Sequence, residues 1–301
     1  MAGAPLAKPE LLDAATLARI SNMQLLAKTV VEGFILGLHK SPYRGFSVEF
    51  AEYRSYVPGD DIKHIDWKVF AKTDKYYLKL FEEETNLACH LVLDASGSMA
   101  YGSQPLTKFQ YAARMAACLS YFMMRQRDAT GLVLFDTQIR TFLPAHLRQS
   151  HLQRILSTLE ACEPGSETDL AQPLHEVAEA LKRRGLVVLI SDLLGDTQPL
   201  LSALQHLKFA GHDVILFQTL DPDELEFPFD KLVEFTDLET GEKVKTSGRS
   251  AREHYLAELD AHQAAIRNGA ADLRIDHVVF DTRMSLDYAL SEYLYRRGRS
   301  G

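Results

Sequence analysis

The sequence contains few cysteines, no long apolar run and no N-terminal targeting pattern. Its three cysteines, Cys89, Cys118 and Cys162, are never spaced as Cys-x-x-Cys, which disfavours a disulfide framework and a zinc ribbon. No apolar stretch approaches the roughly 20 residues of a bilayer span. Residues 1–10 lack the basic and then apolar layout of a signal peptide. We therefore expect a cytoplasmic protein without a membrane span.

Positive charge is also scarce, because Asp and Glu outnumber Lys and Arg by 41 to 33 and the formal net charge is −8. A negative field repels phosphate backbones, so nucleic acid is not expected as the main partner. The sequence has no Gly-x-x-x-x-Gly-Lys-Ser/Thr loop and no Gly-x-Gly-x-x-Gly loop. We therefore expect no nucleotide cofactor bound through such loops.

The composition is that of a globular protein, with 46% hydrophobic and 25% charged residues among 301. Apolar residues recur at near-helical spacing in residues 11–31, which predicts an amphipathic helix. Residues 34–84 contain alternating, aromatic segments at residues 46–50, 53–57 and 76–81. Ser41-Pro42 and Pro58-Gly59 interrupt this region, and the pattern predicts a small β module. We assign this N-terminal helix and β module to residues 1–85.

Residues 86–301 alternate between apolar strands and amphipathic helices. The helix expected at residues 107–127 carries a continuous apolar stripe of Phe109, Ala112, Ala116, Leu119 and Met123. Strands are expected at residues 87–93, 131–135, 139–143, 186–191, 214–219 and 274–280. This alternation predicts an α/β fold, a doubly wound and mostly parallel sheet with helices on both faces.

One segment interrupts the alternation, at about residues 221–248. Two short strand patterns, at residues 232–235 and 243–245, are joined by Glu239-Thr240-Gly241. The glycine suits a tight turn, so we expect a β-hairpin inserted between a strand and the helix that follows it.

The first group of residues with possible chemistry is Asp94, Ser96 and Ser98, which follow the first apolar strand of the α/β region. In an open α/β sheet, ligands bind outside the carboxyl ends of the strands. One carboxylate and two hydroxyls offer three hard oxygen ligands, the type that Mg²⁺ prefers. Alternatively, Ser96 or Ser98 caps the following helix and Asp94 accepts hydrogen bonds from loop amides.

Two further polar residues are expected at the same edge of the sheet. Asp192 directly follows the apolar strand at residues 186–191. Thr168 lies in the sequence Glu167-Thr168-Asp169, in a loop before a predicted helix.

Together, these motifs resemble a von Willebrand factor A domain, a Rossmann-type fold, with a metal-ion-dependent adhesion site. The N-terminal block Gly-Phe-Ser-Val-Glu-Phe-Ala-Glu-Tyr-Arg-Ser-Tyr-Val-Pro-Gly-Asp-Asp at residues 45–61, followed by Ile-Asp-Trp at 65–67, is more specific. It resembles the bacterial domain-of-unknown-function family fifty-eight, in which such a block precedes an A-type domain. The resemblance extends from about residue 31 to residue 297.

The resemblance implies a site for Mg²⁺, with Mn²⁺ as the alternative ion. The hydroxyls of Ser96 and Ser98 would bind the ion directly and Thr168 directly or through water, while Asp94 and Asp192 would act largely through water. Glu167 stands where the family usually has a small residue.

The resemblance also implies what such a site does. A carboxylate from a partner protein would take the open position on the metal. The expected function is that of a non-enzymatic adapter, working with a MoxR-type AAA+ ATPase on a client protein in maturation or complex assembly.

Two other functions remain open. A Mg²⁺-dependent hydrolase or phosphatase would use Asp94 as its nucleophile. Phosphoaspartyl transfer usually has a second carboxylate two positions later, where this sequence has Ser96, and no Gly-x-Ser-x-Gly motif surrounds either serine. The third possibility is a structural scaffold whose site holds no metal.

Overall fold

The computed structural model describes residues 22–40, 53–55, 77–79, 88–165, 170–239 and 241–297. Contacts divide the chain into two units. One unit is Leu38–Asn86, and the other joins Met1–Gly37 to Leu87–Gly301. The sequence grouped the N-terminal helix with the β module, whereas the structure groups most of that helix with the α/β unit.

The smaller unit contains a two-stranded antiparallel sheet. Strand β1 (Tyr53–Ser55) pairs with strand β2 (Tyr77–Lys79), and Arg54 lies opposite Leu78. Both strands fall inside segments that were predicted to be extended. The remaining predicted strand of the module, at residues 46–50, and the block at residues 56–67 lie outside the described residues.

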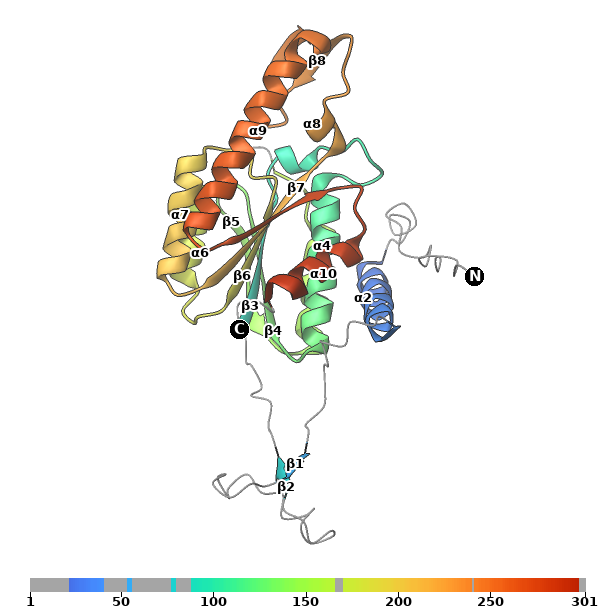
Figure 1. Cartoon of the computed structure of the whole chain (residues 1–301), viewed down its shortest axis with the longest axis vertical. Helices are drawn as coiled ribbons and strands as arrows, with labels where there is room; N and C mark the ends of the chain where they lie inside the picture. The colour runs from blue at the N-terminus through green and yellow to red at the C-terminus, as the bar shows by residue number, and fades with distance from the viewer. Residues whose placement is uncertain are drawn as a thin grey trace, which may run out of the picture. The chain divides into compact units, whose positions relative to one another are not determined.

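The larger unit is built on a six-stranded sheet with the order β10-β7-β6-β3-β4-β5 (Figure 1). The strands are β3 (Ala88–Asp94), β4 (Ala129–Phe135), β5 (Ile139–His146), β6 (Leu186–Ser191), β7 (Asp213–Leu220) and β10 (Asp276–Asp281). Five strands are parallel, and β5 pairs antiparallel with β4. Strands β3 and β6 are almost wholly buried, as expected for central strands covered on both faces.

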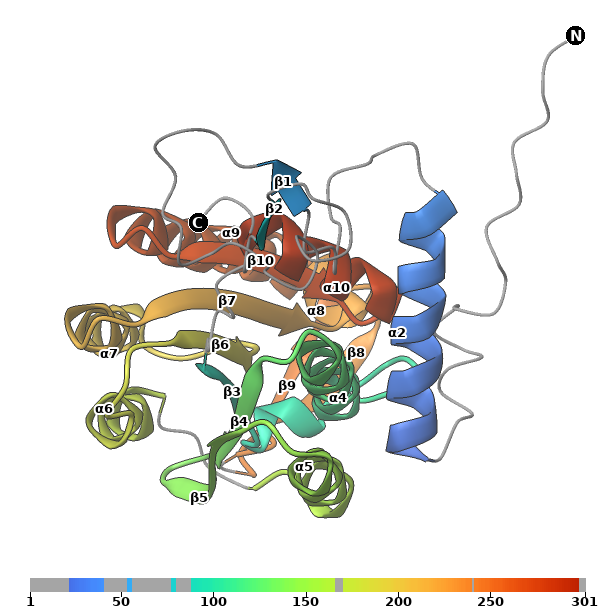
Figure 2. The ribbon, with the colours of Figure 1, turned by 90° about the horizontal axis from the view of Figure 1, so that it is seen from below.

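Helices cover both faces of this sheet, as Figure 2 shows. The face that carries α4 also carries α5 and α10, while α6, α7 and α9 lie on the opposite face. The bounds are α4 (Lys108–Arg125), α5 (Gln149–Ala161), α6 (Ala171–Ala180), α7 (Thr197–Phe209), α9 (Gly248–Asp272) and α10 (Leu286–Arg297). The predicted doubly wound α/β fold is therefore confirmed.

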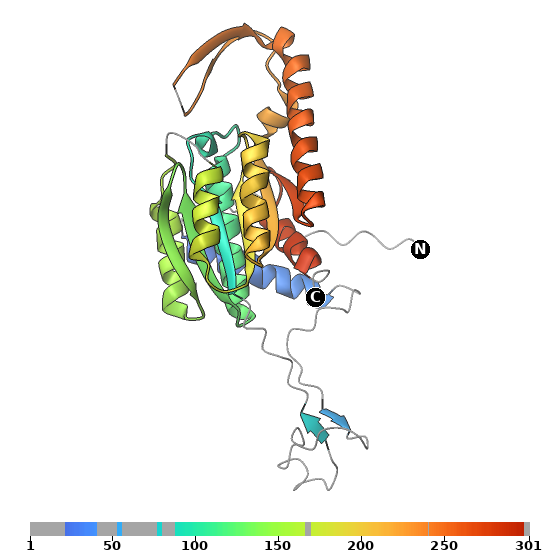
Figure 3. The same ribbon diagram turned by 90° about the vertical axis from the view of Figure 1, so that its left-hand side faces the viewer.

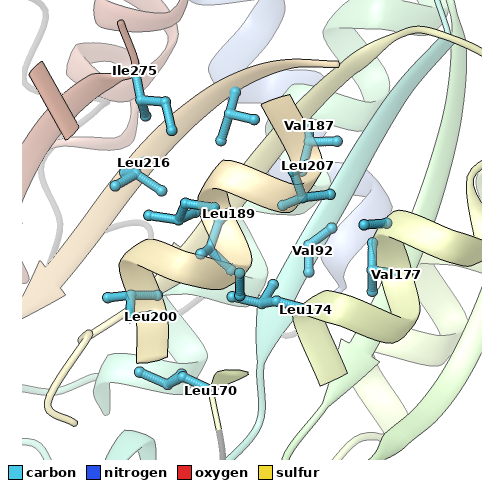
Figure 4. Close-up of a cluster of buried hydrophobic side chains, with 14 of the residues drawn as sticks. Val92, Leu170, Leu174, Val177, Val187, Leu189, Leu200, Leu207, Leu216 and Ile275 are labelled. Carbon is cyan, nitrogen blue, oxygen red and sulfur yellow. The ribbon is translucent and has the colours of Figure 1, made fainter. Parts of the chain in front are cut away.

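Apolar packing on the two faces follows the predicted helix patterns. The stripe predicted on α4 is buried along its whole length. On the other face, Leu174 and Val177 of α6 and Leu200 of α7 pack against strand residues such as Leu189 (Figure 4). The central strands are thus enclosed, and polar side chains on the sheet are concentrated at its ends.

Helix α2 (Met23–Lys40) is longer at its carboxyl end than the sequence pattern suggested. The β module was expected to begin at Phe34, but Phe34 is helical and buried, so that boundary was wrong. Its ring packs edge-on against Phe122 of α4, with 6.3 Å between ring centroids. This tertiary contact explains why the helix continues. The part predicted at residues 11–21 lies outside the described residues.

The predicted hairpin is confirmed as β8 (Leu232–Thr236) paired antiparallel with β9 (Lys243–Ser247). Gly241 has φ of 74°, as a tight turn requires. A short helix that the sequence did not suggest, α8 (Pro222–Glu226), precedes the hairpin. Figure 3 shows the hairpin projecting from the amino end of α9, beyond the edge where the parallel strands end.

No helix in the described part of the chain is both long and apolar enough to cross a bilayer.

The strand order determines where a ligand site is expected. The chain passes from β3 through α4 to β4 on one side, and β6 then pairs with β3 on its other side. The carboxyl ends of β3 and β6 therefore flank the point where the winding direction changes, which is the usual ligand position in such folds.

Candidate functional site

Aspartates line the carboxyl edge of the sheet. Each of the five parallel strands ends in an aspartate or is followed by one, in the spatial order Asp281, Asp221, Asp192, Asp94 and Asp136. Basic side chains neutralise three of them, in the pairs Arg283–Asp281, Lys108–Asp192 and Arg140–Asp136. Within the described residues, Asp94 and Asp221 have no basic partner.

The Asp94 carboxylate is completely buried, and both of its oxygens accept hydrogen bonds. The backbone N–H of Ser96 donates to Oδ1 over 2.9 Å, and the Ser191 hydroxyl donates to Oδ2 over 2.6 Å. Burial, together with the negative charge of Asp192, raises the pKa of Asp94 to about 7, although these hydrogen bonds oppose the shift. Asp94 is therefore held rigidly but is short of positive charge.

The hydroxyls of Ser96 and Ser98 lie side by side, with 3.1 Å between their Oγ atoms. Ser96 is buried, and Ser98 is half-buried at the start of the short 3₁₀ helix η3 (Ser98–Ala100). Neither serine caps α4, because Thr107 does so through a capping box with Gln110. The alternative interpretation was correct only in that Asp94 accepts a loop amide.

Asp192 lies one strand away, after β6, and its carboxylate is already engaged. Its Oδ1 accepts the N–H of Leu194 over 3.2 Å, and its Oδ2 accepts the Lys108 ammonium over 2.7 Å. Its backbone carbonyl accepts the side-chain amide of Gln218 over 2.9 Å. This polar network fixes Asp192, and the ammonium neutralises its charge.

Lys108 also binds Glu224 of α8, with 2.5 Å between Nζ and Oε1. Burial alone would lower the pKa of Lys108, but the two carboxylates outweigh burial and raise it above its ordinary value. Burial also raises the pKa of Glu224, an effect that Lys108 opposes. We assign the ionised form to this cluster because the ammonium has two close anionic partners.

Thr168 and Glu167 lie outside the described residues, but both flanks of their loop are described. The N–H of Gly165 donates to the carbonyl of Ala95 over 2.6 Å. On the other flank, a Cβ on Gly195 would lie 3.3 Å from Leu170. Of the described residues on either side, Gly165 therefore lies beside the Asp94–Ser98 turn, and Leu170 lies beside the turn after Asp192.

The donors that are described suit a hard divalent cation. Two adjacent hydroxyls stand next to a buried carboxylate that lacks a basic partner, and oxygen ligands of this kind suit Mg²⁺. Among the described residues, no three His, Cys, Asp or Glu side chains converge as metal ligands. A cation here would therefore depend on the serine hydroxyls.

The sequence predicted Asp94, Ser96, Ser98 and Asp192 at one edge of the sheet, and the structure places them at its carboxyl edge. It missed Ser191, Lys108 and Glu224. Ser191 directly precedes Asp192, so its place at a strand end was a usable signal. Lys108 had only a weak signal, as a lysine beginning a helix whose next turns are apolar.

Comparison with known proteins supports the family and the fold. The sequence model of the family described as "Protein of unknown function DUF58" matches residues 52–265. An uncharacterized protein of Mycobacterium tuberculosis (strain ATCC 25618 / H37Rv) is 28% identical over 256 residues, which cover 83% of this chain and 79% of that protein.

A solved structure with low sequence identity shares the architecture. An aerotolerance-related membrane protein from Bacteroides fragilis, at 17% identity, covers 70% of this chain and 99% of its own, with a TM-score of 0.50. The SpRpn10 VWA domain, at 12% identity, covers 68% of this chain and 94% of its own, with a TM-score of 0.40.

Proposed function

Since this chain belongs to the DUF58 family of unknown function and has a von Willebrand factor A-like fold, we propose that it is a non-enzymatic protein-interaction adapter. In this proposal, a partner carboxylate binds through a Mg²⁺ ion at the carboxyl ends of β3 and β6. The fold by itself supports the coarser role, protein interaction. The metal, the partner and the absence of catalysis are parts of the proposal.

The observation that carries the proposal is the pair of hydroxyls 3.1 Å apart beside the unneutralised Asp94. Ser96 and Ser98 would hold the ion directly. Asp94, kept in place by Ser191, would orient the turn and act through water, as would Asp192. Thr168 is the proposed further ligand. A bound Mg²⁺ would supply a strong local positive charge, to which an anionic side chain of a partner is attracted.

The direct test is a calorimetric titration of Mg²⁺ into the wild type and Ser96→Ala. We expect binding heat in the wild type and its loss in the variant, because one ligand is removed without adding bulk. Ser157→Ala, which removes an exposed hydroxyl from α5, is the matched control. Equal heats for the wild type and Ser96→Ala would refute the site.

For the partner, we propose a MoxR-type AAA+ ATPase and a client protein in the cytoplasm, on the resemblance carried by residues 45–67. The test is a pull-down from lysate of the source organism, with identification by mass spectrometry. An AAA+ ATPase should be recovered with Mg²⁺ and lost with EDTA or with Ser96→Ala. Recovery that is independent of the metal would contradict the proposed route.

The geometry does not favour the hydrolase alternative. A nucleophilic carboxylate needs an exposed oxygen, whereas Asp94 is completely buried with both oxygens accepting hydrogen bonds. We therefore keep the adapter as the proposed function. A phosphoesterase activity abolished by Asp94→Asn would reverse this choice.

A further inference from the structure

Among the lysines and arginines whose burial the structure describes, Lys108 is the one that is buried. It begins α4, and its ammonium lies between Asp192 at the sheet edge and Glu224 in α8. These partners are 84 and 116 residues away along the chain. A buried ammonium is retained only where carboxylates compensate it, so both partners are needed to hold it.

Glu224 connects this ammonium to the start of the inserted segment. Its Oε2 accepts the backbone N–H of Asp221 over 2.8 Å, while Oε1 binds Lys108. Asp221 in turn accepts the N–H of Asp223 and caps α8. The position of this one-turn helix therefore depends on Glu224, and through it on Lys108.

Helix α8 leads directly into the hairpin. Phe227, its C-cap residue, adopts a left-handed conformation with φ of 46°. Its ring packs against Phe229, Phe235 of β8 and Tyr255 of α9, with centroids 4.7 to 5.6 Å apart. A continuous path of contacts therefore runs from Asp192 through Lys108 and α8 to the hairpin.

The path begins at Asp192 Oδ2, an oxygen for which Lys108 and a bound cation would compete. Asp192 Oδ1 is held by the N–H of Leu194, which leaves Oδ2 as the oxygen bound to Lys108. Asp192 cannot offer Oδ2 to a divalent cation, or to water bound to it, without weakening its contact with Lys108. Glu224 would then become the main partner of Lys108.

We propose that Lys108 is a positioning residue that couples occupancy of the cation site to the β8–β9 hairpin through Glu224. The inference rests on the proposed function. Coupling is reciprocal: a partner that binds and moves the hairpin changes the affinity of the site for the cation by the same factor by which the cation changes the affinity of the hairpin for that partner. The hairpin is thereby a second element whose conformation changes with cation binding and in turn changes the affinity of the site for the cation.

The test compares the wild type with three variants by calorimetry with Mg²⁺ and by hydrogen exchange of residues 222–247 with and without Mg²⁺. Glu224→Gln keeps an acceptor for the Asp221 N–H but leaves Asp192 as the only anionic partner of Lys108. Glu234→Gln, which breaks the exposed ion pairs of Glu234 with Lys243 and Lys245 within the hairpin, is the matched control.

In the wild type and the control, Mg²⁺ should change hairpin exchange. In Glu224→Gln, Mg²⁺ should bind at least about fivefold more weakly, because Asp192 is then the only anionic partner of Lys108 and is held more tightly by it. Hydrogen exchange in the hairpin of this variant should not change when Mg²⁺ is added. The double variant Lys108→Met/Glu224→Gln frees Asp192 and should bind Mg²⁺ more tightly than Glu224→Gln. A purely structural role of Lys108 would instead weaken binding in both variants.

The outcomes separate this inference from the function on which it rests. Absence of Mg²⁺ binding to the wild type would overturn both. Binding that is lost in Ser96→Ala, but is equal in the wild type and Glu224→Gln with an unresponsive hairpin, would overturn the coupling alone.

Discussion

At the scale of single residues, hydroxyl and carboxylate side chains at the carboxyl ends of β3 and β6 are joined by hydrogen bonds. Ser191 donates to Asp94 and accepts the N–H of Leu193, which has a left-handed φ of 56°. The same serine thus holds the Asp94 carboxylate and the turn that carries Asp192. These two contacts define its role.

We expect Ser191→Ala to lower the free energy of unfolding by about 1–3 kcal/mol, because a buried carboxylate oxygen and a buried N–H both lose a partner. Urea unfolding followed by circular dichroism measures the change. Ser157→Ala, on the exposed side of α5, should stay within about 0.5 kcal/mol of the wild type. A Ser191→Ala midpoint equal to that of the wild type would show that water replaces the hydroxyl.

At the scale of elements, two glycines are required, one before the start of β6 and one in the turn of the hairpin. Gly185 precedes β6, where an added Cβ would lie 2.3 Å from the carbonyl oxygen of Ala88 in β3. Gly241 in the hairpin has open space around it but a φ of 74°. The first glycine is required by packing and the second by conformation.

Alanine at these two positions should therefore act differently. Gly185→Ala should cost about 1–3 kcal/mol of global stability, because β3 and β6 must separate. Gly241→Ala should cost about 1–2 kcal/mol and act within the hairpin. Urea unfolding reports the first effect and hydrogen exchange of residues 232–247 the second. A wild-type urea midpoint for Gly185→Ala would contradict the close approach of the strands.

At the scale of the whole molecule, both ends of the sheet bury titratable groups, and Asp128 is buried directly before β4. Aspartates occupy the carboxyl edge, whereas His90, early in β3, and His212, just before β7, are buried towards the other edge. Burial, with the nearby His212, lowers the pKa of His90 from 6.5 to about 4. Burial lowers the pKa of His212 as well.

This arrangement predicts sensitivity to acid. The unfolded chain binds a proton at His90 below pH 6.5, while the folded protein resists protonation until about pH 4. The contribution of His90 to stability is therefore complete above pH 6.5 and falls by about 1–3 kcal/mol as the pH drops towards 4.

Urea unfolding at pH 7.5 and pH 5.0 measures the effect. His90→Leu should reduce the loss at pH 5.0, and His254→Asn, at an exposed position of α9, should behave as the wild type. The same loss in His90→Leu as in the wild type would assign the acid sensitivity to other groups.

Much of the fold follows from local patterns. The apolar run of β6 and the stripe on α4 predicted a buried strand and a buried helix face, and both are observed. The three residues between β4 and β5 also allow only an antiparallel pair, since a parallel connection needs a dozen or more residues. The carboxyl end of α2 was predicted too early in the sequence. Phe34 is helical because its ring packs against Phe122, which lies far along the chain.

For the site, the sequence alone determined that Asp94, Ser96 and Ser98 share one turn after a buried strand, because their spacing is local. Only the tertiary structure decided that Ser191 reaches Asp94 and that Lys108 joins Asp192 to Glu224. Strand order and helix packing bring these partners together over 84 to 116 residues. No local pattern encodes such pairings, because hydrogen bonds and ion pairs form between groups that only the folded sheet makes neighbours.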